Sequence, residues 1–94
     1  MLKPIALVWF RPEDYDEIKR ISDDELHATF EDFERRSEQR LEQLENVGLV
    51  VKKIIVRPGE LETWARAKRV PINSNTRATF GALLLAQLED GWLN

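Results

Sequence analysis

Two Arg-Pro steps carry the most suggestive chemistry in this 94-residue sequence. Residues 9–12 and 55–58 each combine an apolar pair, typical of the end of a strand, with Arg-Pro at the start of a predicted helix. Open α/β sheets bind ligands at the carboxyl ends of their strands, and helix N-termini favour anions. Arg11, Arg57 and Gly59 are therefore candidates for binding a small phosphate-containing anion or metabolite.

A structural interpretation of these arginines stays open. Each has a nearby carboxylate with which it can pair, Glu13 for the first and Glu60 for the second. Gly59 alone is far short of a glycine-rich phosphate loop.

A second candidate site is a basic cluster between the last two predicted helices. Its position beside a short turn invites a helix-turn-helix, nucleic-acid-binding interpretation. The net charge of −3 and the pI of about 5.2 disfavour nucleic acid as a partner. Cations at a helix C-terminus are also stabilised by the helix dipole, which explains them structurally. The cluster comprises Arg66, Lys68, Arg69 and Arg77.

The sequence offers little material for catalysis. It has no cysteine and one histidine, His27. Asp23 and Glu31 are spaced so that either could orient His27 as a general base, but carboxylates at such positions are expected by chance in so acidic a segment. We therefore expect no catalytic residue, no metal site and no cofactor, and the sequence leans away from an enzyme. The lack of cysteine fits a cytoplasmic location. The apolar runs are too short to span a bilayer, so no membrane partner is expected.

Hydropathy and turn residues predict one α/β domain over residues 1–94. The expected order is β-α-α-β-α-α, with two parallel strands joined by a right-handed crossover and packed by helices. The strands are expected at about 4–10 and 49–56, and the helices at about 12–21, 23–46, 59–69 and 75–89.

The long second helix is predicted from a capping box. Ser22 and Glu25 have the spacing at which each side chain caps the other's backbone N–H. Along this helix, i,i+4 ion pairs are expected between Glu31 and Arg35 and between Asp32 and Arg36.

A two-stranded sheet is thin, and a homodimer could complete it to four strands across a two-fold axis. In the alternative, a monomer covers both strand edges with its helices. Lys52, in the middle of the second strand, and Trp92, in the C-terminal tail, are the candidate interface residues.

The segment from Glu60 to Pro71, followed by Arg77-Ala78, resembles the C-terminal half of a group of short uncharacterised bacterial proteins. Trp64, Pro71 and Arg77 carry the resemblance, which covers about a quarter of the chain. It implies a bacterial, cytoplasmic protein and no particular activity. The leading expectation is thus a small protein-interaction or self-associating module without catalytic activity, acting with itself or with another protein.

Overall fold

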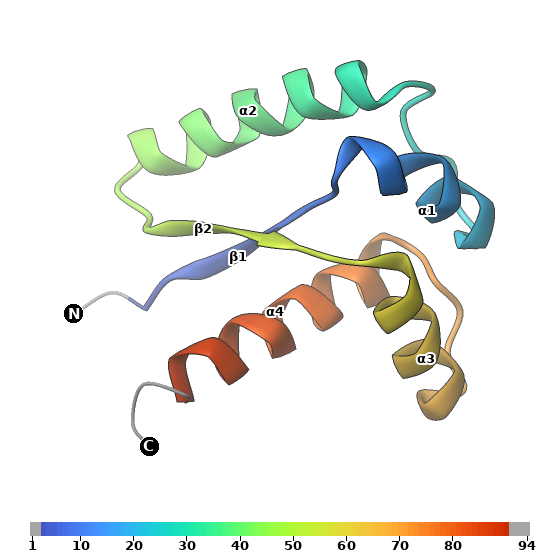
Figure 1. Ribbon diagram of the computed structural model, residues 1–94. Coiled ribbons are helices and arrows are strands. Elements are labelled where there is room, and N and C mark those ends of the chain that lie inside the picture. The colour runs from blue at the N-terminus through green and yellow to red at the C-terminus, as the bar shows by residue number, and fades with distance from the viewer. Residues whose placement is uncertain (1–2, 91–94) are drawn as a thin grey trace.

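A computed structural model describes residues 3–90, so Trp92 lies outside the described residues. The chain forms one small α/β unit whose two strands, β1 (Ile5–Trp9) and β2 (Val51–Ile55), are parallel (Figure 1). Their register runs from Ile5 beside Val51 to Trp9 beside Ile55. This confirms the predicted α/β class, the β-α-α-β-α-α order and the parallel pairing.

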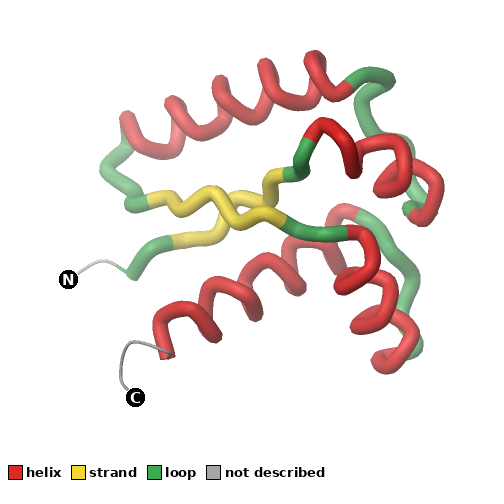
Figure 2. Tube along the Cα trace, in the orientation of Figure 1, coloured by secondary structure: helices red, strands yellow, loops and turns green. Residues whose placement is uncertain are grey.

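The helices form layers above, below and at one end of the sheet (Figures 1 and 2). α2 (Phe30–Asn46) covers one face, and α4 (Ser74–Asp90) covers the other. A short 3₁₀ turn (Pro12–Asp14) leads into α1 (Tyr15–Ile21), which lies with α3 (Pro58–Lys68) beyond the carboxyl ends of the strands. No helix among residues 3–90 combines the length and the apolar character that a bilayer crossing requires.

The two faces of β1 contact different helices, as the alternation of side chains along a strand requires. Trp9 faces α2 and meets Phe33 edge-on, with ring centroids 5.6 Å apart. Val8 faces α4, where Gly81 allows the helix to approach the strand closely. A Cβ at Gly81 would lie 2.7 Å from Val8 Cγ2, so this position has no room for a side chain.

The predicted start of the long helix at residue 23 is wrong: α2 begins at Phe30. Thr29 is the N-cap, and its hydroxyl accepts the Asp32 N–H at 3.1 Å. The Ser22 hydroxyl instead donates to the Ile18 carbonyl at 2.7 Å, at the end of α1. The Asp23 N–H donates to the Ile72 carbonyl at 2.7 Å, which ties this segment to the α3–α4 connection and keeps it out of a helix.

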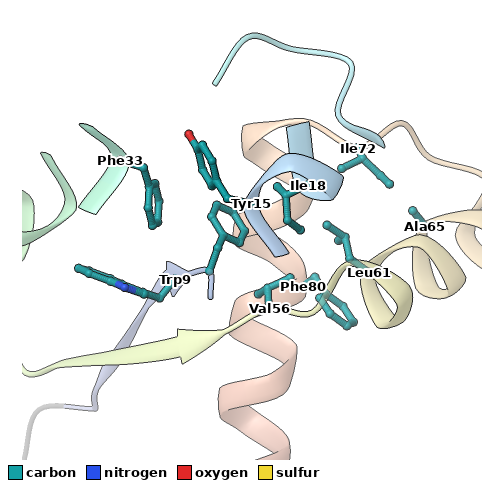
Figure 3. Close-up of a cluster of buried hydrophobic side chains, with 10 residues drawn as sticks. Trp9, Tyr15, Ile18, Phe33, Val56, Leu61, Ala65, Ile72 and Phe80 are labelled. Atoms are coloured by element: carbon teal, nitrogen blue, oxygen red, sulfur yellow. The ribbon is translucent and has the colours of Figure 1, made fainter. Parts of the chain in front are cut away.

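The core lies where the ends of β1 and β2 meet α1, α3 and the start of α2 (Figure 3). Ile18 and Leu61, from α1 and α3, are fully buried there. Tyr15 contributes its ring to an aromatic cluster with Phe10 and Phe33, and its hydroxyl donates to the His27 carbonyl at 2.6 Å. Apolar burial therefore concentrates at the carboxyl end of the sheet, and the middle of β1 has less cover.

Candidate interaction groove beside β1

Arg11 and Arg57 lie close together, but the anion that both of them contact is a carboxylate of this chain. Arg11 makes two hydrogen bonds to Asp14, at 2.7 and 3.1 Å, and Arg57 Nε lies 3.2 Å from the same carboxylate. Asp14 is buried, and the hydrogen bond from Arg11 holds its pKa below the ordinary value. Gly59 is exposed at the start of α3. Asp14 lies three residues after Arg11, and this spacing was the signal in the sequence for the Arg11–Asp14 pair.

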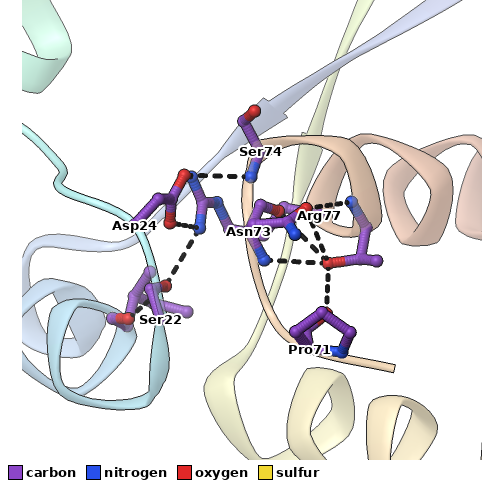
Figure 4. A network of polar contacts seen from close by, with 8 residues as sticks. Ser22, Asp24, Pro71, Asn73, Ser74 and Arg77 are labelled. Atoms are coloured by element: carbon purple, nitrogen blue, oxygen red, sulfur yellow. Dashed lines mark hydrogen bonds and ion pairs between the residues drawn. The ribbon is translucent and has the colours of Figure 1, made fainter. Parts of the chain in front are cut away.

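Arg77, a member of the predicted basic cluster, is engaged inside the protein (Figure 4). Its side chain is 9% exposed and forms a two-pronged pair with Asp24, at 2.7 and 2.9 Å, and a third bond to Ser22 Oγ at 3.0 Å. Asp24 also accepts the Ser74 N–H at 3.0 Å. The hydrogen bonds from Arg77 lower the pKa of Asp24.

The other members of the basic cluster remain on the surface. Arg66, Lys68 and Arg69 are exposed at the end of α3, where Arg69 has a left-handed backbone with φ of 58°. Because Arg77 is paired with Asp24, the exposed basic patch is smaller than the sequence indicated. Trp64 packs against Phe80 with ring centroids 5.2 Å apart.

The described residues, 3–90, contain no grouping of side chains that could bind a metal ion. In that range no cluster of three or more histidine, aspartate or glutamate residues could hold a metal ion. His27 is exposed, and its structural contact is through the backbone carbonyl that accepts from Tyr15.

A groove of about 760 Å³ runs along β1, between α2 and α4. We call it the β1 groove. Its floor is the strand segment Ala6–Val8, and Phe10 and Tyr15 lie near one end. The two helical walls are lined by Arg36, Ser37 and Arg40 from α2 and by Ser74, Arg77 and Ala78 from α4.

Backbone polarity shows which groups β1 offers to this groove. The Ile5 N–H donates to the Val50 carbonyl at 2.9 Å, and the Trp9 carbonyl accepts the Val56 N–H at 2.9 Å. Alternate residues of a strand direct their backbone groups to opposite edges, so Ala6 and Val8 direct theirs away from β2. The sheet, as far as the structure describes it, has no strand beyond β1 on that side.

The outer edge of β2 differs from that of β1. Lys53 extends over the Trp9 ring, 4.1 Å from its centroid, and pairs with Glu38 at 2.8 Å. Lys52 is exposed on the opposite face of the strand, and the hollow on this side is smaller, about 480 Å³. Lysines within an edge strand oppose pairing with another chain, whereas β1 carries no charge at all.

Sequence reasoning missed the β1 groove. The available signals were the uncharged first strand beside a lysine-bearing second strand, and two arginines four residues apart on the long helix. No protein-family model, curated protein or solved structure matches this chain.

Proposed function

We propose that this protein is a non-catalytic interaction module in which β1 receives an extended segment of another polypeptide as an added strand. The observation that carries the proposal is the uncharged edge of β1 at the floor of an open groove, where no other strand among residues 3–90 pairs with it. In strand addition the main-chain hydrogen bonds supply affinity, and pockets for alternate side chains supply specificity. The helical walls of the β1 groove provide such surroundings.

The edge has the hydrogen-bonding capacity that this mode needs. Ala6 and Val8 each direct one N–H and one carbonyl into the groove, which gives two donors and two acceptors. An added strand meets all four, while the pairing of β1 with β2 is untouched.

A second copy of this chain is one possible source of the strand. A two-fold axis at Leu7 would set Ala6 of one copy opposite Val8 of the other, in an antiparallel arrangement with four hydrogen bonds. This is the self-associating form of the proposal, and it gives the four-stranded sheet expected from the sequence. A cytoplasmic location in a bacterium is part of the proposal, since the cysteine-free sequence suits a reducing compartment.

The earlier alternatives have less support. An anion site at Arg11 and Arg57 would have to displace Asp14, which both arginines already contact. Nucleic-acid binding at the end of α3 would lack Arg77, which is paired with Asp24.

The test is a proline substitution at the free edge. Ala6→Pro removes one outward-facing N–H, and edge strands tolerate proline where that N–H is not used within the sheet. Val51→Pro is the matched control, because Val51 directs its N–H away from β1, to the outer edge of β2.

Two measurements read out this pair of variants. Selection of a displayed random heptapeptide library should enrich sequences that bind the unmodified chain and the Val51→Pro variant but not Ala6→Pro. Sedimentation velocity over micromolar concentrations shows whether a second copy occupies the same edge. If selected peptides and self-association are both indifferent to Ala6→Pro, strand addition at β1 is wrong.

A further inference from the structure

We infer that the β1 groove selects an extended segment of a partner protein in which acidic side chains alternate with apolar ones. This inference rests on the proposed strand addition and assigns the chemistry of the strand. It starts from the α2 wall, where Arg36 and Arg40 line the groove. Neither arginine forms an ion pair with any residue between 3 and 90.

The availability of Arg36 has a local cause. Asp32, its expected i,i+4 partner, pairs with Arg35 at 2.8 Å instead. Arg36 is therefore exposed on the groove side, one helical turn from Arg40. Two guanidinium groups in a row make this wall a receptor for carboxylates, which arginine can bind with two parallel hydrogen bonds.

The spacing of the two arginines matches an added strand. Four residues of helix advance by about 6 Å, at roughly 1.5 Å per residue. Residues i and i+2 of a strand lie about 6.6 Å apart and point to the same face. Since α2 runs along the sheet (Figure 1), carboxylates at alternate positions of the added strand meet Arg36 and Arg40 in turn.

The opposite wall favours apolar residues at the intervening positions. Side chains of the added strand that point toward α4 meet Ala78 and the side chains of Ala6 and Val8 on β1. Arg77 in this wall is already neutralised by Asp24. Among the other residues that line the groove, Arg36 and Arg40 are positively charged and Glu25 is negatively charged. The net charge of the groove lining is therefore positive.

The same charges argue against a second copy as the occupant. A two-fold axis at Leu7 would bring the α2 wall of one protomer beside that of its partner, because a two-fold interface joins the same surface of both. Arg36 and Arg40 would then face their own counterparts, and like charges in such positions oppose association. An acidic partner strand removes this repulsion.

The experiment compares two synthetic hexapeptides with blocked ends by isothermal titration calorimetry and amide chemical-shift mapping. One alternates glutamate with valine, and the other alternates lysine with valine. We expect the acidic peptide to bind at least tenfold more tightly, with an affinity that falls as salt rises. The shifts should centre on Ala6 and Val8.

Charge variants test the α2 wall. Arg36→Glu/Arg40→Glu should weaken binding of the acidic peptide by at least tenfold and improve binding of the basic one. If the first variant folds poorly, Arg36→Gln/Arg40→Gln tests the same point, because it removes both positive charges without reversing them. It should weaken binding of the acidic peptide. Arg66→Glu/Lys68→Glu, on the exposed end of α3, changes net charge equally and should leave the preference unchanged.

The outcomes separate this inference from the function on which it rests. Equal binding of both peptides, abolished by Ala6→Pro, overturns the acidic selectivity and supports strand addition. Acidic binding that is unaffected by Ala6→Pro overturns both. A dimer that is disrupted by Ala6→Pro, with no peptide bound, assigns the edge to a second copy and overturns the acidic partner.

Discussion

At the scale of single residues, the main polar linkage joins parts of the chain that are distant in sequence. Arg77 on α4 binds both Asp24 and Ser22 in the segment before α2. The sequence suggested other roles for two of these residues: a nucleic-acid contact for Arg77 and a helix cap for Ser22. No local pattern reveals that a residue will meet another more than fifty positions away, so this part of the structure could not be predicted.

Removal of Arg77 should destabilise the fold. Arg77→Ala leaves Asp24 without its partner in a part-buried site, and we expect a loss of about 2–4 kcal/mol in the free energy of unfolding, below the upper values for fully buried pairs. Urea denaturation measures it. Arg66→Ala, at an exposed arginine, should change stability by less than about 0.5 kcal/mol. Equal effects of the two substitutions would contradict the assigned role of the pair.

Stability should also depend on pH through Asp14 and Asp24. Their arginine partners lower both pKa values in the folded protein. The resulting stabilisation is present above the unfolded aspartate pKa of about 3.9 and is lost as the pH falls through the folded values. Asp14→Asn should therefore be less stable than the parent at pH 7 and lose less stability between pH 6 and pH 3. Asp16→Asn, at an exposed position, should follow the parent curve in thermal unfolding.

At the scale of elements, the sequence predicted the strands well and the start of α2 poorly. Runs of β-branched and aromatic residues identify β1 and β2, and the helices between them require parallel pairing. The motif at Ser22 and Glu25 had the spacing of a capping box, yet Thr29 caps the helix. Tertiary bonds to Ile72 and Arg77 outweigh the local preference.

The cap itself can be tested by substitution. Thr29→Ala removes the acceptor for the Asp32 N–H and should cost about 1 kcal/mol of stability. Glu25→Ala is the matched control, because Glu25 would be essential in the capping box and lies before the helix here. A larger loss from Glu25→Ala than from Thr29→Ala in chemical denaturation would restore the earlier helix start.

The contact between α4 and the sheet depends on a residue without a side chain. Gly81→Ala would force Val8 and α4 apart, since the new Cβ lies 2.7 Å from Val8 Cγ2. We expect about 1–3 kcal/mol of destabilisation from this overpacking, despite the better helix propensity of alanine. Ala82→Ser, at the exposed neighbouring position, should be nearly neutral. Stabilisation by Gly81→Ala in thermal unfolding would refute the close approach.

At the scale of the whole molecule, the two edges of the sheet have different properties. β2 carries Lys52 and Lys53, while β1 is uncharged and opens into the β1 groove. The sequence suggested completion of the sheet, but it could not show which edge stays free. That depends on where α2 and α4 lie. The role of Arg36 was equally hidden, because Arg35 and Arg36 compete for the same aspartate.

Hydrogen exchange should report this asymmetry directly. In the free protein the Ala6 and Val8 amides should exchange faster than the Leu7 amide, which points toward β2. Addition of the glutamate–valine peptide should slow exchange at Ala6 and Val8 and leave Leu7 unchanged. Residue-resolved NMR measures these rates. Slow exchange of Val8 without peptide would mean that the edge is already covered.

The parallel pairing of β1 with β2 has a consequence during protein synthesis. β1 emerges from the ribosome before β2, and this partner strand is complete only after Phe10 to Ile55 have followed. At about 5–20 residues per second this takes roughly 2–9 s, during which β1 is unpaired on both edges. A newly made chain thus exposes an uncharged apolar strand for seconds, so its yield in cells should depend on translation speed and on chaperones that shield such segments.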